Sequence, residues 1–453
     1  MSGSRALRLQ RKAFRFIALY CAGLLLSAQD MRQVTEPVMR PVCTALTARM
    51  QQVKEDEPDT QRIQEAIDRC APGQAVELKA DGANHAFLSG PLHLRSGVAL
   101  VIDKGVTLFA SRNPRDYDIT PGSCGILSKA GHGCRALING DHVDHAAVMG
   151  EGTIDGRGGE KIAGKNFSWW DLAEQARNTD KNQNCPRLIV LSHSNDFTLY
   201  KVTLRNSPNF HVYFGQGNGF TAWGVIINSP KNARNTDGID PGSSTNVTIT
   251  HCFIHAGDDQ VAIKAGETGP STHMTIAHNH FYTGHGISIG SETVGGVSAI
   301  RVSDLTIDGA DNGIRIKSNS SRGGLVQDVV YEDVCIRDTK NPILMDTHYS
   351  FYGSARNLIP EFRNITLRNV TILGGGKITL DGFDPQHLLQ MHFDNVIARG
   401  AAPTVQARFA DIQEGPGPVN FRIPGVSIRT IKAPGPAQAG SGSCPFVPMP
   451  ESQ

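Results

Sequence analysis

Three aspartates and a histidine occupy related positions of a repeating pattern in the middle of this 453-residue chain. When the repeats are aligned on the first apolar residue of a short alternating segment, the position two residues earlier holds Asp237, Asp259, His285 and Asn312. Asp258 stands beside Asp259. If the repeats stack as coils, these side chains form a column on one face. Each motif alone is common on ordinary turns, so the shared register is what predicts a site.

Two cations belong to the same patch. Ile314 and Ile316 alternate with Arg315 and Lys317, so inward isoleucines leave both cations facing outward. Carboxylates on adjacent coils repel when ionised, so one pKa should rise. A protonated carboxyl beside an ionised one suits glycoside hydrolysis, and the cations suit a substrate carboxylate. The pattern predicts a hydrolase of an anionic polysaccharide, and it calls for no metal or cofactor.

A pattern of apolar, x, apolar, x, x, apolar, x, apolar residues must position these side chains. It recurs at intervals of 23 to 36 residues, and only Asn279 breaks it badly. Short segments in which apolar, often β-branched residues alternate with other residues indicate strands. A repeat period near 25 residues indicates a stacked solenoid. A β-propeller is the alternative, but its repeats are longer, roughly 40–45 residues. We therefore expect an all-β, right-handed parallel β-helix. The pattern starts at Phe197, Phe220, Val247, Met274, Ile300, Val329 and Ile365.

The first 28 residues have the layout of a secretory signal peptide. A basic stretch from Arg5 to Arg15 precedes an apolar run at 16–26 and the small residues Ser27 and Ala28. The run is too short to span a bilayer, which disfavours the alternative of a membrane anchor. We expect a secreted protein with no membrane attachment in its mature form. Removal of this segment leaves 39 basic and 43 acidic residues, a net charge of −4 in place of +1, which lacks the excess of a nucleic-acid binder.

The rest of the chain divides by composition. Residues 29–85 are expected to form a helical cap, with helices at 44–54 and 60–70, on a catalytic β-helix that spans 86–433. Residues 434–453 are rich in Pro, Gly and Ser and are expected to form a loose tail.

An exported protein can form disulfides. The pairs Cys43/Cys70 and Cys124/Cys134 each bracket a short segment and are expected to bond. No CxxC spacing indicates a metal site. The cysteines without a sequence-based pairing are Cys185, Cys252, Cys335 and Cys444.

Together these motifs resemble the polygalacturonases of glycoside hydrolase family 28, especially the secreted bacterial endo-acting members. The resemblance covers the chain from Cys43 to about Asn395, with four signature blocks in the family's order. It implies a right-handed parallel β-helix that hydrolyses the α-1,4-galacturonosyl bonds of polygalacturonate, the pectin of plant cell walls, with inversion. The four blocks are NTDGIDPGSSTNVTI (235–249), GDDQVAIKAG (257–266), GHGISIGSE (284–292) and RIKS (315–318).

The resemblance also implies roles for individual residues. Asp258 would be the general acid, Asp237 and Asp259 would activate the attacking water, and His285 would support the acid. The implied substrate contacts are Arg315, Lys317 and, by its spacing alone, Tyr349.

Other functions remain possible on the same scaffold. A pectate lyase would use Ca²⁺ and give unsaturated products, and an adhesin or polysaccharide-binding module would need no acid trio. Internal cleavage is expected over exo action, because neither an added N-terminal domain nor a long insertion between coils is apparent. We also expect a monomer with a locally positive substrate site around Arg315 and Lys317, aided by Lys264.

Overall fold

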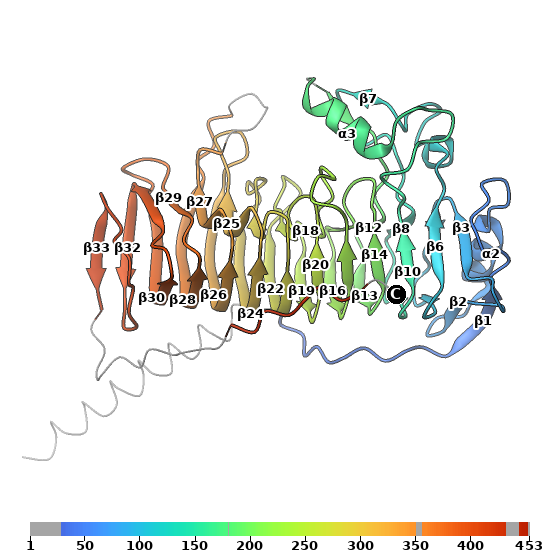
Figure 1. The fold of residues 1–453 in the computed structure, drawn as a ribbon, viewed down its shortest axis with the longest axis horizontal. Helices are drawn as coiled ribbons and strands as arrows, with labels where there is room; N and C mark the ends of the chain where they lie inside the picture. The colour runs from blue at the N-terminus through green and yellow to red at the C-terminus, as the bar shows by residue number, and fades with distance from the viewer. Residues whose placement is uncertain (1–28, 180, 350–355, 432–443, 452–453) are drawn as a thin grey trace, which may run out of the picture.

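The chain winds into a long stack of coils in which each strand lies beside the equivalent strand of the next coil (Figure 1). The computed structural model describes residues 29–179, 181–349, 356–431 and 444–451, so the expected signal peptide lies outside the described residues. Two long parallel sheets build the stack, which confirms the expected all-β parallel β-helix. Within the described residues, no helix is long and apolar enough to cross a membrane.

The larger sheet has 20 strands and the smaller one has 11. The strands of the larger sheet are β1 (Val42–Thr47), β2 (Ala75–Lys79), β3 (Ala86–Ser89), β5 (Ala99–Ile102), β6 (Thr107–Ala110), β9 (Ala147–Met149), β10 (Thr153–Asp155), β13 (Asn195–Tyr200), β14 (Thr203–Arg205), β16 (Asn218–Trp223), β17 (Ile226–Asn228), β19 (Thr245–Thr250), β20 (Phe253–His255), β22 (Ser271–Phe281), β24 (Val297–Asp308), β26 (Leu325–Arg337), β28 (Glu361–Leu373), β30 (Leu389–Arg399), β32 (Ala410–Glu414) and β33 (Ser427–Thr430). The strands of the smaller sheet are β4 (Leu92–His93), β8 (Ile138–Asp141), β12 (Ile189–Ser192), β15 (Val212–Gly215), β18 (Ile239–Gly242), β21 (Val261–Ile263), β23 (Ile287–Ile289), β25 (Asn312–Lys317), β27 (Asn341–Asp346), β29 (Lys377–Asp381) and β31 (Thr404–Arg408).

The apolar pattern becomes continuous ladders inside the stack. Phe197 pairs with Phe220 and Phe220 with Val247, and all three side chains are fully buried. The two-residue interruption of the pattern contains a residue with positive φ, such as Lys201, which bends the strand so that both halves keep their apolar side inward. Asn279 is tolerated because its side chain donates to the Ile249 carbonyl and accepts from a backbone amide.

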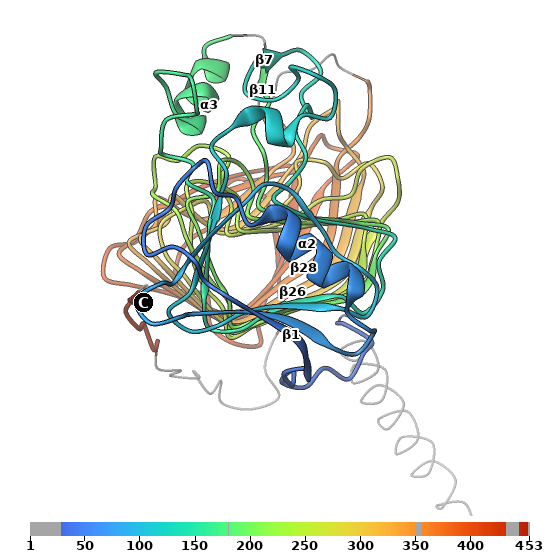
Figure 2. The same cartoon turned by 90° about the vertical axis from the view of Figure 1, so that its right-hand side faces the viewer.

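The N-terminal part differs from the expectation. Strand β1 stands where a helix over 44–54 was predicted, so that prediction is wrong. β1 and β2 already belong to the larger sheet, which therefore includes strands before the expected start of the coils at residue 86. Helix α2 (Thr60–Arg69) confirms the second predicted helix and lies at the end of the stack that Figure 2 views end-on. Its role as a cap stays a prediction.

Two long segments leave the stack between coils, contrary to the expectation of no long insertion. One runs from residue 111 to 137 and contains the short helix η1 (Pro114–Tyr117) and β7 (Leu127–Ser128). The other runs from 156 to 188 and contains α3 (Trp169–Arg177) and β11 (Asn182–Gln183), which pairs with β7. Both project from the same side of the solenoid (Figure 1).

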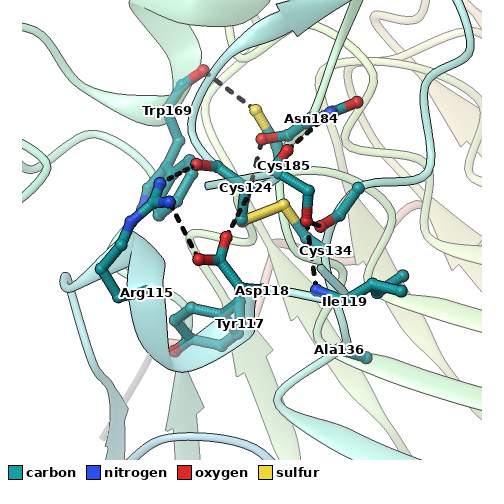
Figure 3. The surroundings of a disulfide bond; sticks show 12 residues. Arg115, Tyr117, Asp118, Ile119, Cys124, Cys134, Ala136, Trp169, Asn184 and Cys185 are labelled. Carbon is teal, nitrogen blue, oxygen red and sulfur yellow. Dashed lines mark hydrogen bonds and ion pairs between the residues drawn. A yellow bond between two sulfur atoms is a disulfide. The ribbon is translucent and has the colours of Figure 1, made fainter. Parts of the chain in front are cut away.

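The first of these segments is fixed by the disulfide between Cys124 and Cys134, as predicted (Figure 3). The Asp118 carboxylate accepts from the backbone amide of Cys124 at 2.7 Å and from Arg115 at 2.8 Å. The free thiol of Cys185 donates to the backbone carbonyl of Trp169 at 3.6 Å. Asn184 joins the two insertions, because its side chain donates to the Ser123 carbonyl at 2.7 Å and its own carbonyl accepts from the Gly125 amide at 2.9 Å.

The end of the chain is also fixed. Cys43 bonds to Cys70 as predicted, and a third disulfide joins Cys335 to Cys444. The described residues 444–451 are thereby attached to the larger sheet, where Tyr282 donates to the Val447 carbonyl at 3.1 Å. The expectation of a loose tail is wrong for these residues, because the disulfide partner on β26 could not be read from composition.

Candidate active site

The expected column forms on the smaller sheet. β18, β21, β23 and β25 are neighbours, with Ile239 paired to Val261, Val261 to Ile287 and Ile287 to Ile314. These four residues are fully buried, so the register predicted from the apolar pattern is confirmed. The residues two positions earlier lie on successive coils, and they are Asp237, Asp259, His285 and Asn312.

Asp259 lies at the centre of a buried ion cluster. Arg315 Nη1 donates to its Oδ1 at 3.1 Å, and Lys317 Nζ donates to its Oδ2 at 2.8 Å. The Ser288 hydroxyl donates to Oδ1 at 2.7 Å, a contact that the sequence analysis missed. Burial opposes ionisation, but Lys317 and Arg315 outweigh it and lower the pKa of Asp259. In the free protein the two cations therefore hold an internal carboxylate.

The neighbouring Asp258 pairs with His285. Their Oδ1 and Nδ1 atoms are 2.9 Å apart, and the His285 amide donates to the Asp258 carbonyl at 2.9 Å. Burial would lower the pKa of His285, but the hydrogen bond and charge of Asp258 raise it. Burial would likewise raise the pKa of Asp258, but His285, with Lys317 and Arg315, lowers it. An ionised Asp258 beside an imidazolium is therefore the favoured state without substrate.

Asp237 has the opposite character. Burial raises the pKa of Asp237 well above its usual range, and the charge of Asp240 adds to this against the opposing charge of Lys264. Lys264 Nζ lies 3.3 Å from Asp237 Oδ2 and also donates to Asp240. Within the described residues, Oδ1 of Asp237 and Oδ1 of Asp240 have no hydrogen-bond partner. Among the three aspartates of the motifs, the carboxyl with the raised pKa is thus Asp237, whereas the motif had implied a protonated Asp258.

Asp240 completes this second cluster and was not singled out from the sequence. Burial raises the pKa of Asp240 to about 6, although Lys264 opposes the shift. The alternation of the strand could have identified Asp240 as a site residue. Asp240 lies one residue beyond the inward Ile239 and therefore faces outward with Lys264. Lys264 had been expected only to add to a positive field.

Tyr349 also reaches the site. Its ring centroid lies 5.5 Å from the Arg315 guanidinium carbon and 5.4 Å from Lys317 Nζ. The side chain of Asn319 donates to the Tyr349 carbonyl at 2.9 Å and so helps to hold this segment. All seven residues implied by the motifs are therefore brought together, although their roles stay predictions.

The acid cluster does not suit a metal ion. Asp258, Asp259 and His285 each offer one ligand atom within 4.8 Å of the others. However, Oδ1 and Oδ2 of Asp259 already accept from Arg315 and Lys317 respectively. A divalent cation in contact with two fixed cations would be repelled, so these residues fit an anionic substrate better.

Comparisons with known proteins agree with this arrangement. The sequence model described as "Glycosyl hydrolases family 28" matches residues 70–408. The endo-polygalacturonase of Pectobacterium carotovorum subsp. carotovorum is 44% identical over 396 residues, which cover 87% of this chain and 95% of that protein. A polygalacturonase of Ralstonia solanacearum is 39% identical and covers 93% of this chain and 92% of its own length.

A solved structure is also similar. The polygalacturonase from Erwinia carotovora ssp. carotovora superposes with a TM-score of 0.81 at 43% identity. The match covers 85% of this chain and the whole of that one.

Proposed function

Because the chain belongs to family 28 of the glycosyl hydrolases, and is therefore an enzyme that hydrolyses glycosidic bonds, we propose that it cleaves the α-1,4-galacturonosyl bonds of polygalacturonate at internal positions with inversion. The observation that carries this proposal is the set of four carboxylates, one imidazole and three cations on adjacent coils. Paired carboxyls with separated pKa values supply acid and base, and the cations suit a uronate.

We assign the roles by motif. Asp258 is the general acid, Asp237 and Asp259 activate the attacking water, and His285 orients Asp258 through the 2.9 Å hydrogen bond. Arg315 and Lys317 bind the carboxylate of the substrate residue at the scissile bond. Tyr349 contacts both cations with its ring.

These roles require Asp237 to be ionised and Asp258 to be protonated once substrate is bound. His285 contributes most to the lowered pKa of Asp258, and a substrate carboxylate next to Arg315 and Lys317 neutralises the further lowering that these two cations cause. Lys264 remains to stabilise an ionised Asp237. Substrate binding thus favours an ionised Asp237, which acts as a base, and a protonated Asp258, which acts as the acid; both groups exchange their protons with solvent.

Internal cleavage is supported by the name of the similar Pectobacterium enzyme. The absence of insertions no longer supports it, because two long segments leave the stack. Secretion is consistent with the three disulfides, which form in oxidising compartments. We propose that residues 1–28 direct export and that the mature enzyme is a monomer.

The test is hydrolysis of polygalacturonate, with measurement of both reducing ends and early product sizes. Asp258→Asn should lower kcat by about 10²- to 10⁴-fold, the usual contribution of a general acid. Asp56→Asn, which changes an exposed aspartate remote from the column, is the matched control. Unchanged activity of Asp258→Asn would refute the assignment.

Product analysis separates the alternative functions. A mixture of oligomers at early times supports internal cleavage, whereas mono- or digalacturonate alone from the start indicates exo action. Products with ultraviolet absorbance from a new double bond indicate a lyase. Binding to polygalacturonate without new reducing ends indicates a binding module.

A further inference from the structure

The column of site residues continues beyond Asp237 toward the N-terminal coils. Ile189 of β12 pairs with Val212 of β15, and Val212 pairs with Ile239 of β18. The residues two positions before these three are Arg187, Phe210 and Asp237. Arg187 therefore occupies the same place as Asp237, two coils away.

Backbone hydrogen bonds show the same stacking. The amide of Leu188 donates to the Phe210 carbonyl at 3.1 Å, and the amide of His211 donates to the Asp237 carbonyl at 2.8 Å. The amide of Gly238 in turn donates to the Asp259 carbonyl at 2.9 Å. Arg187 thus lies in one continuous line with the two aspartates.

The guanidinium of Arg187 is enclosed by aromatic rings. Its central carbon lies 4.6 Å from the ring centroid of Phe210 and 5.0 Å from that of Tyr213. Burial lowers the pKa of Arg187, while the more distant charges of Asp240 and Asp237 oppose this. In the described part of the chain, no hydrogen bond or ion pair joins this guanidinium to any acceptor.

Lys264 makes the contrast clear. Its Nζ lies 4.4 Å from the same Phe210 ring, but it is paired with Asp237 and Asp240. A half-buried cation without an acid is costly, and such groups are normally paired. The planar guanidinium of Arg187 has five N–H donors. It packs on two aromatic rings, and no anion of the described chain accepts from it.

We propose that Arg187, packed on Phe210 and Tyr213, binds a second substrate carboxylate, on a uronate residue that lies toward the N-terminal coils from the scissile bond. This inference rests on the proposed function. A uronate polymer carries one carboxylate on every sugar, so a chain that follows the column presents an anion to Arg187 as well as to Arg315 and Lys317. The enzyme therefore requires free acid groups at two separated sugars, and a methyl ester at the sugar that reaches Arg187 weakens binding.

The test uses galacturonate oligomers of increasing length and the variant Arg187→Gln. Loss of a charge-assisted hydrogen bond should raise KM about tenfold or more once the oligomer is long enough to reach Arg187, with kcat much less affected. Cleavage positions in end-labelled oligomers should shift. Arg187→Lys should give an intermediate KM because it keeps the charge and loses the fork.

Arg399→Gln is the matched control, because it removes one exposed cation from β30 on the other sheet. An equal KM change at every oligomer length, or no change at all, would overturn the inference while leaving the proposed function intact. Wild-type enzyme that does not hydrolyse polygalacturonate would instead refute the proposed function. If Arg187→Gln does not fold, wild-type KM values for oligomers esterified at defined sugars decide: no dependence on the ester at the predicted sugar refutes the site.

Discussion

At the scale of single residues, four carboxyls on adjacent coils are held in different protonation states by their neighbours. Asp259 and Asp258 are kept ionised by cations and an imidazolium. Burial raises the pKa values of Asp237 and Asp240, and the opposing charge of Lys264 does not offset it. Separation of the pKa values, rather than the number of acids, is what allows one group to act as acid and another as base.

The pH dependence of the reaction tests the proposed change in protonation. A general acid must be protonated, so the rate falls as pH rises through its pKa. The kcat/KM profile reports the free enzyme and the kcat profile reports the complex, in which a bound carboxylate increases the proton affinity of the site. We expect kcat to fall at a higher pH than kcat/KM does on the basic side of the two profiles, which we call their basic limbs.

Lys317→Met should reduce the difference between the two limbs, because the free enzyme then lacks one cation that lowers the pKa of Asp258. Lys104→Met, at an exposed lysine in the N-terminal part of the chain, should leave the difference unchanged. Coincident basic limbs in the wild-type enzyme would contradict the change in protonation.

At the scale of elements, each coil contains a bend that keeps its two strands facing the core. Each coil must also come into close contact with the next one, and the glycines beside His285 illustrate this requirement. A Cβ on Gly286, where φ is +76°, would lie 2.0 Å from the Gly313 carbonyl oxygen. A Cβ on Gly284 would lie 2.7 Å from the Asp258 carbonyl oxygen. The Gly-His-Gly motif is therefore a packing requirement that also fixes the position of His285.

Gly286→Ala tests this requirement. The backbone of the next coil cannot move away without breaking the sheet, so we expect the free energy of unfolding to fall by about 3 kcal/mol or more and kcat to decrease. Denaturant unfolding and activity measure the two effects. Gly266→Ala is the control, because its Cβ would meet nothing closer than 3.9 Å and its φ is not positive. Equal stability of both variants would contradict the steric argument.

The disulfide between Cys335 and Cys444 makes a separate prediction, since it spans 109 residues. Replacement of both cysteines by serine should lower the free energy of unfolding by about 2–4 kcal/mol, because a long loop gains much entropy on release. Activity should persist, because β26 belongs to the sheet that does not carry the site. The same change at Cys124 and Cys134, only 10 residues apart, should cost less. A larger loss for the short loop would contradict the entropic explanation.

At the scale of the whole molecule, the two ends of the described chain lie against the larger sheet, and the site lies on the smaller one. Asp30 accepts from the Thr248 hydroxyl at 2.7 Å, and Val447 accepts from Tyr282. Both ends of the described chain therefore lie away from the sheet that carries the site. Residues 29–453 carry a net charge of −4, so attraction of a polyanion depends on the local cations of the column.

Ionic strength distinguishes local attraction from global repulsion. Between about 0.01 M and 0.15 M salt the Debye length falls from about 30 Å to about 8 Å. If the column attracts the substrate, KM for polygalacturonate should rise over this range, and it should rise less for Lys317→Met than for Arg399→Gln. A KM that falls with salt would show that the net negative charge dominates.

The sequence by itself determined the repeat, the register and the column. Alternation with period two and a bend at a fixed place are local properties, so the inward position of Ile239 already placed Asp237 on the outer face. The family resemblance was readable for the same reason, because its motifs are contiguous. The cysteine pairs close in sequence were also predictable, whereas a partner 109 residues away was not.

Only the tertiary structure decided how the charges are shared. Arg315 and Lys317 hold Asp259, Lys264 joins Asp237 to Asp240, and Arg187 has no acid partner in the described chain. The failed helix over 44–54 has a similar origin, since pairing with β2 outweighed local preference. Ion pairing and pKa depend on burial and on distances between coils, and these quantities exist only once the coils have stacked.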